Sequence, residues 1–252
     1  MIISPSREFV FIHIEKCGGT SVETALEPYL HWSDIILGST DFGESYQQLL
    51  NNRFGNDQVK KYMLWKHSTA EDIFSFIGLD MWKEFRKISV VREPVDLIKS
   101  LYFFSQTAVN YHIGRVNYGK WKEFLRTNKF PESWPYNEPF VHAYAKSYID
   151  GSGIDGFVKE ILGNAYDFVS PQYERIQVLG KADLDVVIDL STLNDRWADV
   201  SESIGIVGAD PIGHLNSSER DDIELSHKSI KAIKKHFAID YQELPRYTGV
   251  YW

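Results

Sequence analysis

A cation, two glycines and two hydroxyl groups stand together near the start of the chain, in the run Lys16-Cys17-Gly18-Gly19-Thr20-Ser21. The run follows an apolar segment, residues 9–14, and precedes a stretch with helical periodicity. At such a strand-to-helix turn, free backbone N–H groups and the positive end of the helix dipole attract an anion. Paired glycines allow close approach of the backbone, and the lysine adds a positive charge. The run therefore predicts a site for a phosphate-like anion, although a Gly-Gly turn can also be purely structural.

Arg92 is a second candidate for binding an anion. It ends the apolar run 87–92 and is followed by Glu93 and Pro94. Proline favours the first turn of a helix, so Arg92 is expected at a strand-to-helix junction, with Ser100 about two helical turns further on. Both side chains could then hold one phosphate. The alternative is an ion pair between Arg92 and a nearby carboxylate.

His67 is the candidate proton acceptor. It follows residues 62–65, an apolar run that predicts a strand, and precedes Ser68 and Thr69, which predict the start of a helix. An imidazole beyond the carboxyl end of a strand can accept a proton near neutral pH, although it can also be a core residue. The rival bases are His13, His112, His142, His214, Glu15 and Glu71.

These residues are connected by alternating strand and helix patterns. Apolar runs predict strands over residues 9–14, 62–65, 87–92 and 185–189. Single apolar stripes predict helices over residues 20–30 with Thr20 or Ser21 as N-cap, from Pro94 onward, over 193–204 and over 224–237. The alternation predicts an α/β fold with a parallel, doubly wound sheet flanked by helices.

Length and composition limit the classes of protein that fit. The 252 residues suit a single domain over 1–252, and the net charge of −8 opposes sequence-independent binding of nucleic acid. Cys17 is the only cysteine, so no intrachain disulfide can form, and a reducing cytoplasm is the expected location. We find neither a secretory leader nor an apolar run long enough to span a membrane, so no membrane association is expected.

Two motifs carry a resemblance to a known family. The sequence IHIEKCGGTS resembles the 5′-phosphosulfate loop of carbohydrate sulfotransferases, whose usual form is H-x-P-K-x-G-G-T-S; Glu15 replaces the usual proline. The segment from Val90 to Ser100 resembles the 3′-phosphate motif of the same family, with Leu97 in place of a frequent second arginine. Weaker similarities to the bacterial and carbohydrate branch lie at residues 66–70 and 214–218.

The resemblance implies a sulfotransferase with a P-loop-like nucleotide-binding fold. Its donor would be 3′-phosphoadenosine-5′-phosphosulfate (PAPS), and its product 3′-phosphoadenosine-5′-phosphate (PAP). The run from Lys16 to Ser21 would hold the 5′-phosphosulfate, and Arg92 with Ser100 the 3′-phosphate. Ser217 and Ser218 would contact the nucleotide, unless they form a plain Asn-Ser-Ser turn.

The same resemblance implies catalytic roles. Lys16 would stabilise the leaving phosphate and His67 would accept the proton of the acceptor hydroxyl. No metal is expected, because a sulfuryl group carries less charge than a phosphoryl group and no cluster of residues has credible metal-ligand spacing.

The acceptor is expected to be a carbohydrate or another hydroxylated small molecule. Residues 103–170, rich in Tyr, Asn, Gly and Trp and interrupted by prolines, predict helices joined by irregular loops that face the acceptor. A nucleotide-dependent, kinase-like phosphotransferase and a catalytically silent PAPS-binding scaffold are the alternatives. The absence of GxxxxGK[ST] opposes the first. The sequence does not indicate an oligomeric state.

Overall fold

The structure, a computed structural model, describes residues 1–38, 40–54, 64–113, 144, 147–148, 150–163, 169–213, 223–247 and 250–252. The chain divides into two compact units. The first comprises Met1–Glu93, Pro171–Ser217 and Phe237–Trp252, and the second comprises Pro94–Ser170 and Ser218–His236. Compact units need not fold independently, so a single domain over 1–252 stays a prediction.

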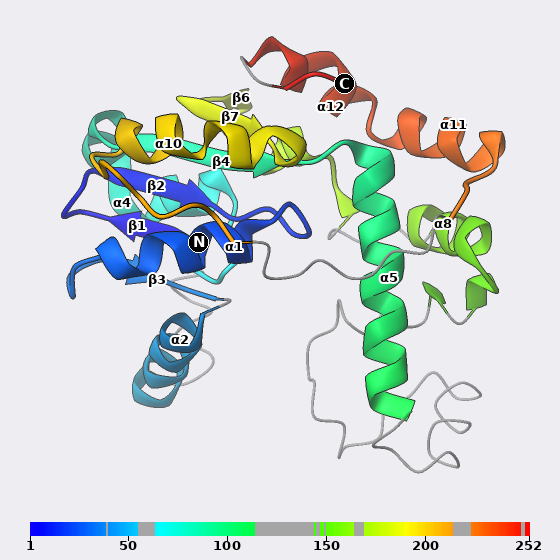
Figure 1. Ribbon diagram of the computed structural model, residues 1–252, viewed down its shortest axis with the longest axis horizontal. Helices are drawn as coiled ribbons and strands as arrows, with labels where there is room; N and C mark the ends of the chain where they lie inside the picture. Colours follow the sequence, from blue (N-terminus) through cyan, green and yellow to red (C-terminus); the bar gives the residue numbers. More distant parts are fainter. Residues whose placement is uncertain are drawn as a thin grey trace. The chain divides into compact units, whose positions relative to one another are not determined.

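The first unit is built around a five-stranded sheet with the strand order β3-β1-β2-β4-β7 (Figure 1). The strands are β1 (Ile2–Ser4), β2 (Phe9–Ile12), β3 (Ile35–Ile36), β4 (Arg86–Val91) and β7 (Val186–Asp189). Strand β4 is parallel to both β2 and β7, whereas β1 is antiparallel to β2 and β3. The sheet is therefore mostly parallel, and the prediction of an all-parallel sheet is wrong at β1.

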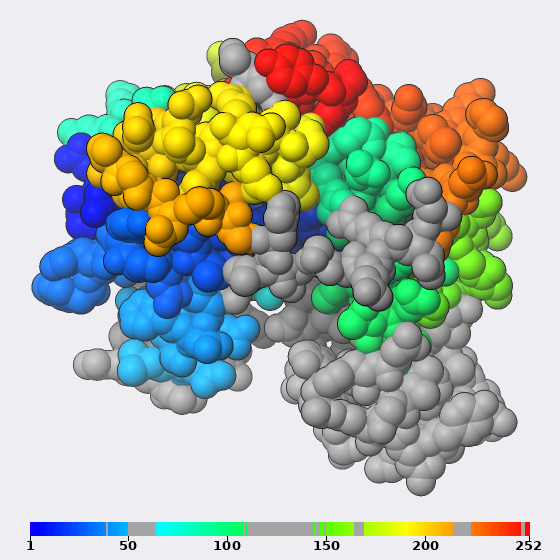
Figure 2. All heavy atoms as spheres, viewed as in Figure 1, coloured from blue at the N-terminus to red at the C-terminus, as the bar shows by residue number. Residues whose placement is uncertain are grey.

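Helices cover the sheet on both faces, which explains why β2 and β4 are continuous apolar runs rather than alternating patterns. The helices α1 (Gly19–Leu26) and α10 (Leu193–Ser203) share one core cluster with side chains of β2, β4 and β7. Figure 2 shows the side chains of α10 in yellow beside those of α1 in blue on one face of this unit. On the other face lies α4 (Ala70–Glu84), which is kinked at Gly78.

Shorter elements complete the first unit. They are the helices α2 (Asp41–Phe54), α9 (Gln172–Arg175) and α12 (Ala238–Glu243), the 3-10 turns Glu27–Tyr29, Leu190–Thr192 and Leu244–Arg246, and the two-stranded ribbon of β5 (Gln177–Val178) and β6 (Lys181–Ala182). Asp240 of α12 accepts hydrogen bonds from the backbone N–H groups of Gln172 and Tyr173, so α12 holds α9 in place.

The second unit contains α5 (Pro94–Ile113), α8 (Ile154–Gly163) and α11 (His227–His236). The rings of Tyr102 on α5 and Phe157 on α8 meet edge to face at 5.5 Å, and Asp155 of α8 accepts a hydrogen bond from the Ser226 hydroxyl. The end of α5 and all of α8 fall within the predicted helical portion 103–170; most of the remainder lies outside the described residues.

Several boundaries differ from the sequence predictions. Leu64 and Trp65 are not in a strand, and the first half of the predicted strand 62–65 lies outside the described residues. The helix predicted over 20–30 ends at Leu26, because a 3-10 turn with Pro28 follows. Among the described residues, no helix has both the length and the apolar character required to cross a bilayer.

Candidate functional site

The loop between β2 and α1 has the backbone geometry of an anion-binding turn. Lys16 and Gly18 both have positive φ angles, 60° and 79°. Gly18 is the N-cap of α1 and no side chain caps the helix, so the prediction of Thr20 or Ser21 as N-cap is wrong. Thr20 and Ser21 lie in the first turn and are partly exposed. An N-terminus without a side-chain cap leaves backbone N–H groups available for an anion.

Close packing explains the two glycines. A Cβ atom on Gly19 would lie 2.2 Å from Cδ2 of His13, and one on Gly18 would lie 2.5 Å from Cδ1 of Leu190. Gly18 also has a left-handed backbone that disfavours other residues. The glycines therefore allow the loop to lie directly against the His13 ring and the 3-10 turn that follows β7.

Arg92 contacts this loop. Its Nη1 donates a hydrogen bond to the carbonyl oxygen of Lys16 at 3.2 Å, and its side chain is buried. The contact brings the second basic motif to the first, whereas the sequence analysis predicted a separate anion site for each. Ser100 lies in α5 of the second unit, so its use together with Arg92 stays a prediction.

Gln172 and Asp240 hold the backbone of Arg92. The Gln172 side chain accepts from the Arg92 N–H at 2.8 Å and donates to the Arg92 carbonyl oxygen at 2.7 Å. Its Oε1 also accepts from the Cys17 thiol at 3.2 Å, and its Nε2 donates to Asp240 at 3.3 Å. Burial raises the pKa of Asp240 to about 6 although N–H groups donate to its carboxylate. Burial likewise raises the pKa of the Cys17 thiol, which opposes a nucleophilic role.

His67 lies in a turn before α4 and not at the end of a strand, which corrects the prediction for its position. Its Nδ1 lies 3.1 Å from the carbonyl oxygen of His13. A carbonyl oxygen only accepts, so Nδ1 carries the proton and Nε2 of the neutral ring is an acceptor. Burial, reinforced by the positive charge of His13, lowers the pKa of His67 well below 6.5. The neutral ring thus has the tautomer that a general base requires.

Glu15 and Arg175 connect the loop to His67. Nη2 of Arg175 lies 3.2 and 3.1 Å from the two carboxylate oxygens of Glu15 and donates to the His67 carbonyl oxygen at 3.0 Å. Burial raises the pKa of Glu15, and the charge of Arg175 opposes that rise. Because its carboxylate is already paired, Glu15 is a poor candidate for the catalytic base.

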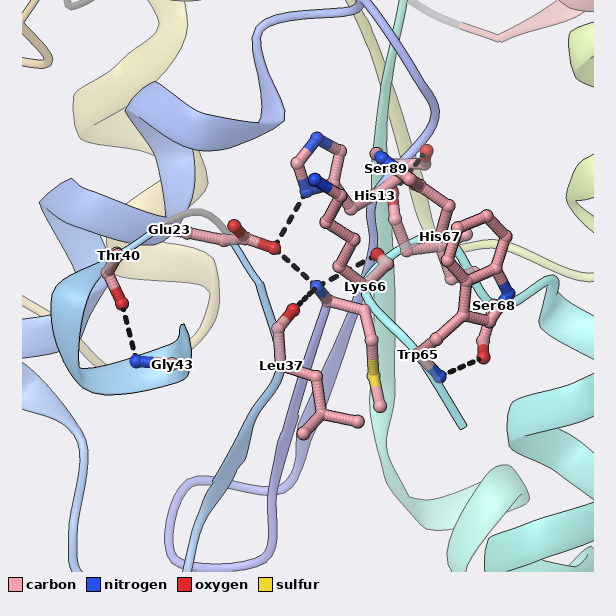
Figure 3. Close-up of polar contacts among 12 residues, drawn as sticks. His13, Glu23, Leu37, Thr40, Gly43, Trp65, Lys66, His67, Ser68 and Ser89 are labelled. Atoms are coloured by element: carbon pink, nitrogen blue, oxygen red, sulfur yellow. Dashed lines mark hydrogen bonds and ion pairs between the residues drawn. The ribbon is translucent and has the colours of Figure 1, made fainter. Parts of the chain in front are cut away.

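His13 and Glu23 form a buried pair beneath the loop (Figure 3). His13 Nδ1 donates to Glu23 Oε1 at 2.8 Å, and the α-amino group of Met1 donates to the same oxygen. Burial opposes ionisation of Glu23, but the charges of His13 and the amino group outweigh it and lower its pKa to about 2. The His13 ring lies 4.6 Å from the His67 ring, edge to face.

Of the other rival bases, Glu71 is bonded to a residue outside this cluster, and the side chains of the rest are not described. Glu71 accepts a hydrogen bond from the backbone N–H of Leu179 at 2.6 Å. His112 is in α5, but its side chain is not described. The remaining candidates, His142 and His214, lie outside the described residues, as do Ser217 and Ser218.

The structure brings Arg92 to the loop that carries Lys16, connects this loop to the His67 turn through Arg175, and adds partners that the sequence analysis missed. The missed residues are Glu23, Gln172, Arg175 and Asp240. One signal was present for Arg175: an acid at the end of an apolar run, Glu15, needs a cation when it is buried. Nothing in the sequence connected Gln172 to Arg92, which lies 80 positions away.

Comparisons with models of known protein families, with curated proteins and with solved structures gave no match. Within the described ranges, no group of three or more His, Cys, Asp or Glu side chains could hold a metal ion. The chemistry that the geometry supports is that of an anion site, because an arginine contacts the loop that carries Lys16 and the uncapped N-terminus of α1.

Proposed function

We propose that this protein is a sulfotransferase that moves a sulfuryl group from PAPS to the hydroxyl group of a carbohydrate or a similar small acceptor. The observation that carries the proposal is the hydrogen bond from Arg92 to the Lys16 carbonyl oxygen. It joins the two motifs that resemble the 5′-phosphosulfate loop and the 3′-phosphate motif of sulfotransferases. Two basic motifs at one place suit a nucleotide that carries anionic groups at two positions.

The residues fit the donor chemically. The N-terminus of α1 has no side-chain cap, and such an N-terminus favours an anion. Lys16 supplies a charge at the same turn. Arg92 places a guanidinium group at this loop, and a guanidinium group is well suited to bind a phosphate.

Each residue would have a distinct role in the transfer. The acceptor oxygen attacks the sulfur atom while the bond between sulfur and the oxygen of the 5′-phosphate breaks, so PAP leaves with the bridging oxygen. The acceptor proton passes to Nε2 of His67, the nitrogen that the bond from Nδ1 to His13 leaves unprotonated. Lys16 stabilises the charge that develops on the leaving phosphate.

A transfer assay with sulfur-labelled PAPS tests the proposal. The purified protein is incubated with a panel of sugars and polysaccharides in EDTA, and labelled product is measured together with PAP. We expect the two in equal amounts with at least one acceptor. Transfer of the γ-phosphate of ATP in Mg²⁺ would instead establish the kinase-like alternative, and nucleotide binding without transfer would indicate a scaffold. A cytoplasmic location stays a prediction, to be tested by cell fractionation.

A further inference from the structure

The single turn α9 contacts all three parts of the candidate site, although no sequence motif pointed to it. Gln172 at its first position reaches Arg92 and Cys17, and Arg175 at its last position reaches Glu15 and His67. Within the described residues, side chains of α9 thus bond to the loop between β2 and α1, to Arg92 and to the turn that contains His67.

The Gln172 side-chain amide pairs with the backbone of Arg92 in the way that a neighbouring strand would. It bonds both the N–H and the carbonyl oxygen of Arg92, the residue directly after β4. Its carbonyl oxygen accepts from the Arg92 N–H, and one of its N–H groups donates to the Arg92 carbonyl oxygen. Its second N–H donates to Asp240. Gln172 is 1% exposed. A buried amide with this many partners cannot easily change its conformation, so it fixes the backbone position from which the Arg92 side chain extends.

Arg175 acts on the other half of the site. One nitrogen of its guanidinium group bonds both the Glu15 carboxylate and the His67 carbonyl oxygen. The pair is largely buried, with side-chain exposures of 15% for Arg175 and 14% for Glu15. Because Glu15 directly precedes Lys16, Arg175 connects the loop that carries the lysine to the turn that carries the histidine.

We propose that α9 positions the two halves of the active site separately, Gln172 setting Arg92 for the nucleotide and Arg175 setting His67 for the acceptor proton. The inference rests on the proposed sulfuryl transfer for its kinetic test. It assigns Gln172 and Arg175 as positioning residues rather than catalytic ones, since each acts through another residue. Gln172 is therefore expected to affect nucleotide binding, and Arg175, three positions later, is expected to affect the transfer step.

The test compares Gln172→Met and Arg175→Met with the neighbouring control Glu174→Gln, whose side chain is exposed. We expect Gln172→Met to weaken PAP binding about tenfold with kcat at saturating PAPS nearly unchanged. We expect Arg175→Met to lower kcat about tenfold with PAP affinity retained, and Arg175→Lys to recover part of the loss. A tenfold change in either quantity corresponds to about 1.4 kcal/mol. If Gln172→Met and Arg175→Met each reduced kcat and PAP affinity equally, the role of α9 would be structural alone and the proposal would be overturned.

A spectroscopic readout separates this inference from the proposed function. The ¹⁵N signals of the His67 ring report its tautomer without any substrate. They are expected to shift in Arg175→Met, and in the milder Arg175→Lys if the first variant does not fold, but not in Glu174→Gln or Gln172→Met. If the wild type neither binds PAP nor transfers sulfate, the function fails while these signals still test the role of Arg175. Unchanged His67 signals in both Arg175 variants would overturn it.

Discussion

The ionisable groups on the two sides of the loop between β2 and α1 differ in their surroundings. Below it, His13 and Glu23 are buried and bonded to each other. On its other side, Lys16 is only partly buried and α1 begins without a side-chain cap. A carboxylate bonded to an imidazole would suggest a catalytic pair from residue types alone. Here Glu23 also accepts from the Met1 amino group, so the buried side stabilises the fold, and the chemistry is assigned to the partly exposed side.

The two adjacent histidines repeat this contrast. His13 donates from Nδ1 to a carboxylate, whereas His67 donates from Nδ1 to the neutral carbonyl oxygen of His13. Burial lowers the pKa of both rings, but the Glu23 carboxylate opposes this at His13, whereas His67 has only a carbonyl partner. Of the two rings, His67 is therefore the one suited to give up and accept a proton at Nε2. The partner, and not the residue type, distinguishes the roles.

Removing the cation of the partly exposed side should have the largest effect. We expect Lys16→Ala to lower kcat/KM for sulfuryl transfer by about 10³-fold, because a charge that develops in the transition state loses its partner. Initial rates with PAPS and circular dichroism measure activity and folding together. Lys83→Ala, at an exposed lysine of α4, is the control and should keep full activity. A folded Lys16→Ala enzyme with normal turnover would remove Lys16 from the mechanism.

On the buried side, Glu23→Gln should change stability rather than chemistry. The pKa of Glu23 is about 2 in the folded protein, against an ordinary value of 4.5. A lowered pKa contributes stability that is complete above pH 4.5 and is lost as the pH falls towards 2. The contribution is about 3 kcal/mol, from about 1.4 kcal/mol per pKa unit.

Urea unfolding of the wild type and of Glu23→Gln at several pH values between 7 and 3 checks this. The two proteins should differ most at pH 7, and the difference should shrink as the pH falls. The exposed Glu84→Gln should follow the wild type throughout. A constant difference between wild type and Glu23→Gln would show that ionised Glu23 contributes no stability.

His67→Gln should reduce turnover about 10²-fold while leaving PAP affinity nearly unchanged, because a general base contacts the acceptor rather than the nucleotide. The pKa of His67 is lowered well below 6.5. The protonated ring cannot accept a proton, so kcat of the wild type should stay constant down to pH 6.5 and fall only at lower pH. Profiles of kcat against pH for the wild type, for His67→Gln and for the exposed control His31→Gln measure both effects. A wild-type profile that already falls above pH 7 would assign the base to another residue.

The sequence predicted those parts of the fold that have long, regular patterns. Strands β2, β4 and β7 and helices α1 and α10 were expected from apolar runs and helical stripes, within a few residues at each end, and the start of α5 was expected at Pro94. Strands β1 and β3 were missed because they have three and two residues, too few for a recognisable period. The α/β class was correct, whereas the antiparallel β1 was not foreseen.

The candidate site was predictable only where residues close in sequence act together. The Lys16 to Ser21 turn and the junction at Arg92 are local patterns, and the structure brings them into contact. The contacts of Gln172 and Arg175 join positions 68 or more residues apart, and a one-turn helix has no periodicity to reveal it. Glu23 looked like an ordinary polar residue of an amphipathic helix, since its partner, the Met1 amino group, lies 22 positions away in the sequence.

The central claim, that the partly exposed side of the loop binds a nucleotide with two anionic positions, is tested most directly by calorimetry. PAP, ADP and ATP are titrated into the wild type and into Arg92→Ala, each in EDTA and in Mg²⁺. ADP and ATP lack the 3′-phosphate, so a partly desolvated Arg92 would lose its charged partner and binding should be at least about tenfold weaker. We expect PAP alone to bind tightly, independently of Mg²⁺, and Arg92→Ala to reduce its affinity to that of ADP. Equal affinities of the wild type for the three nucleotides, or binding that requires Mg²⁺, would contradict the account.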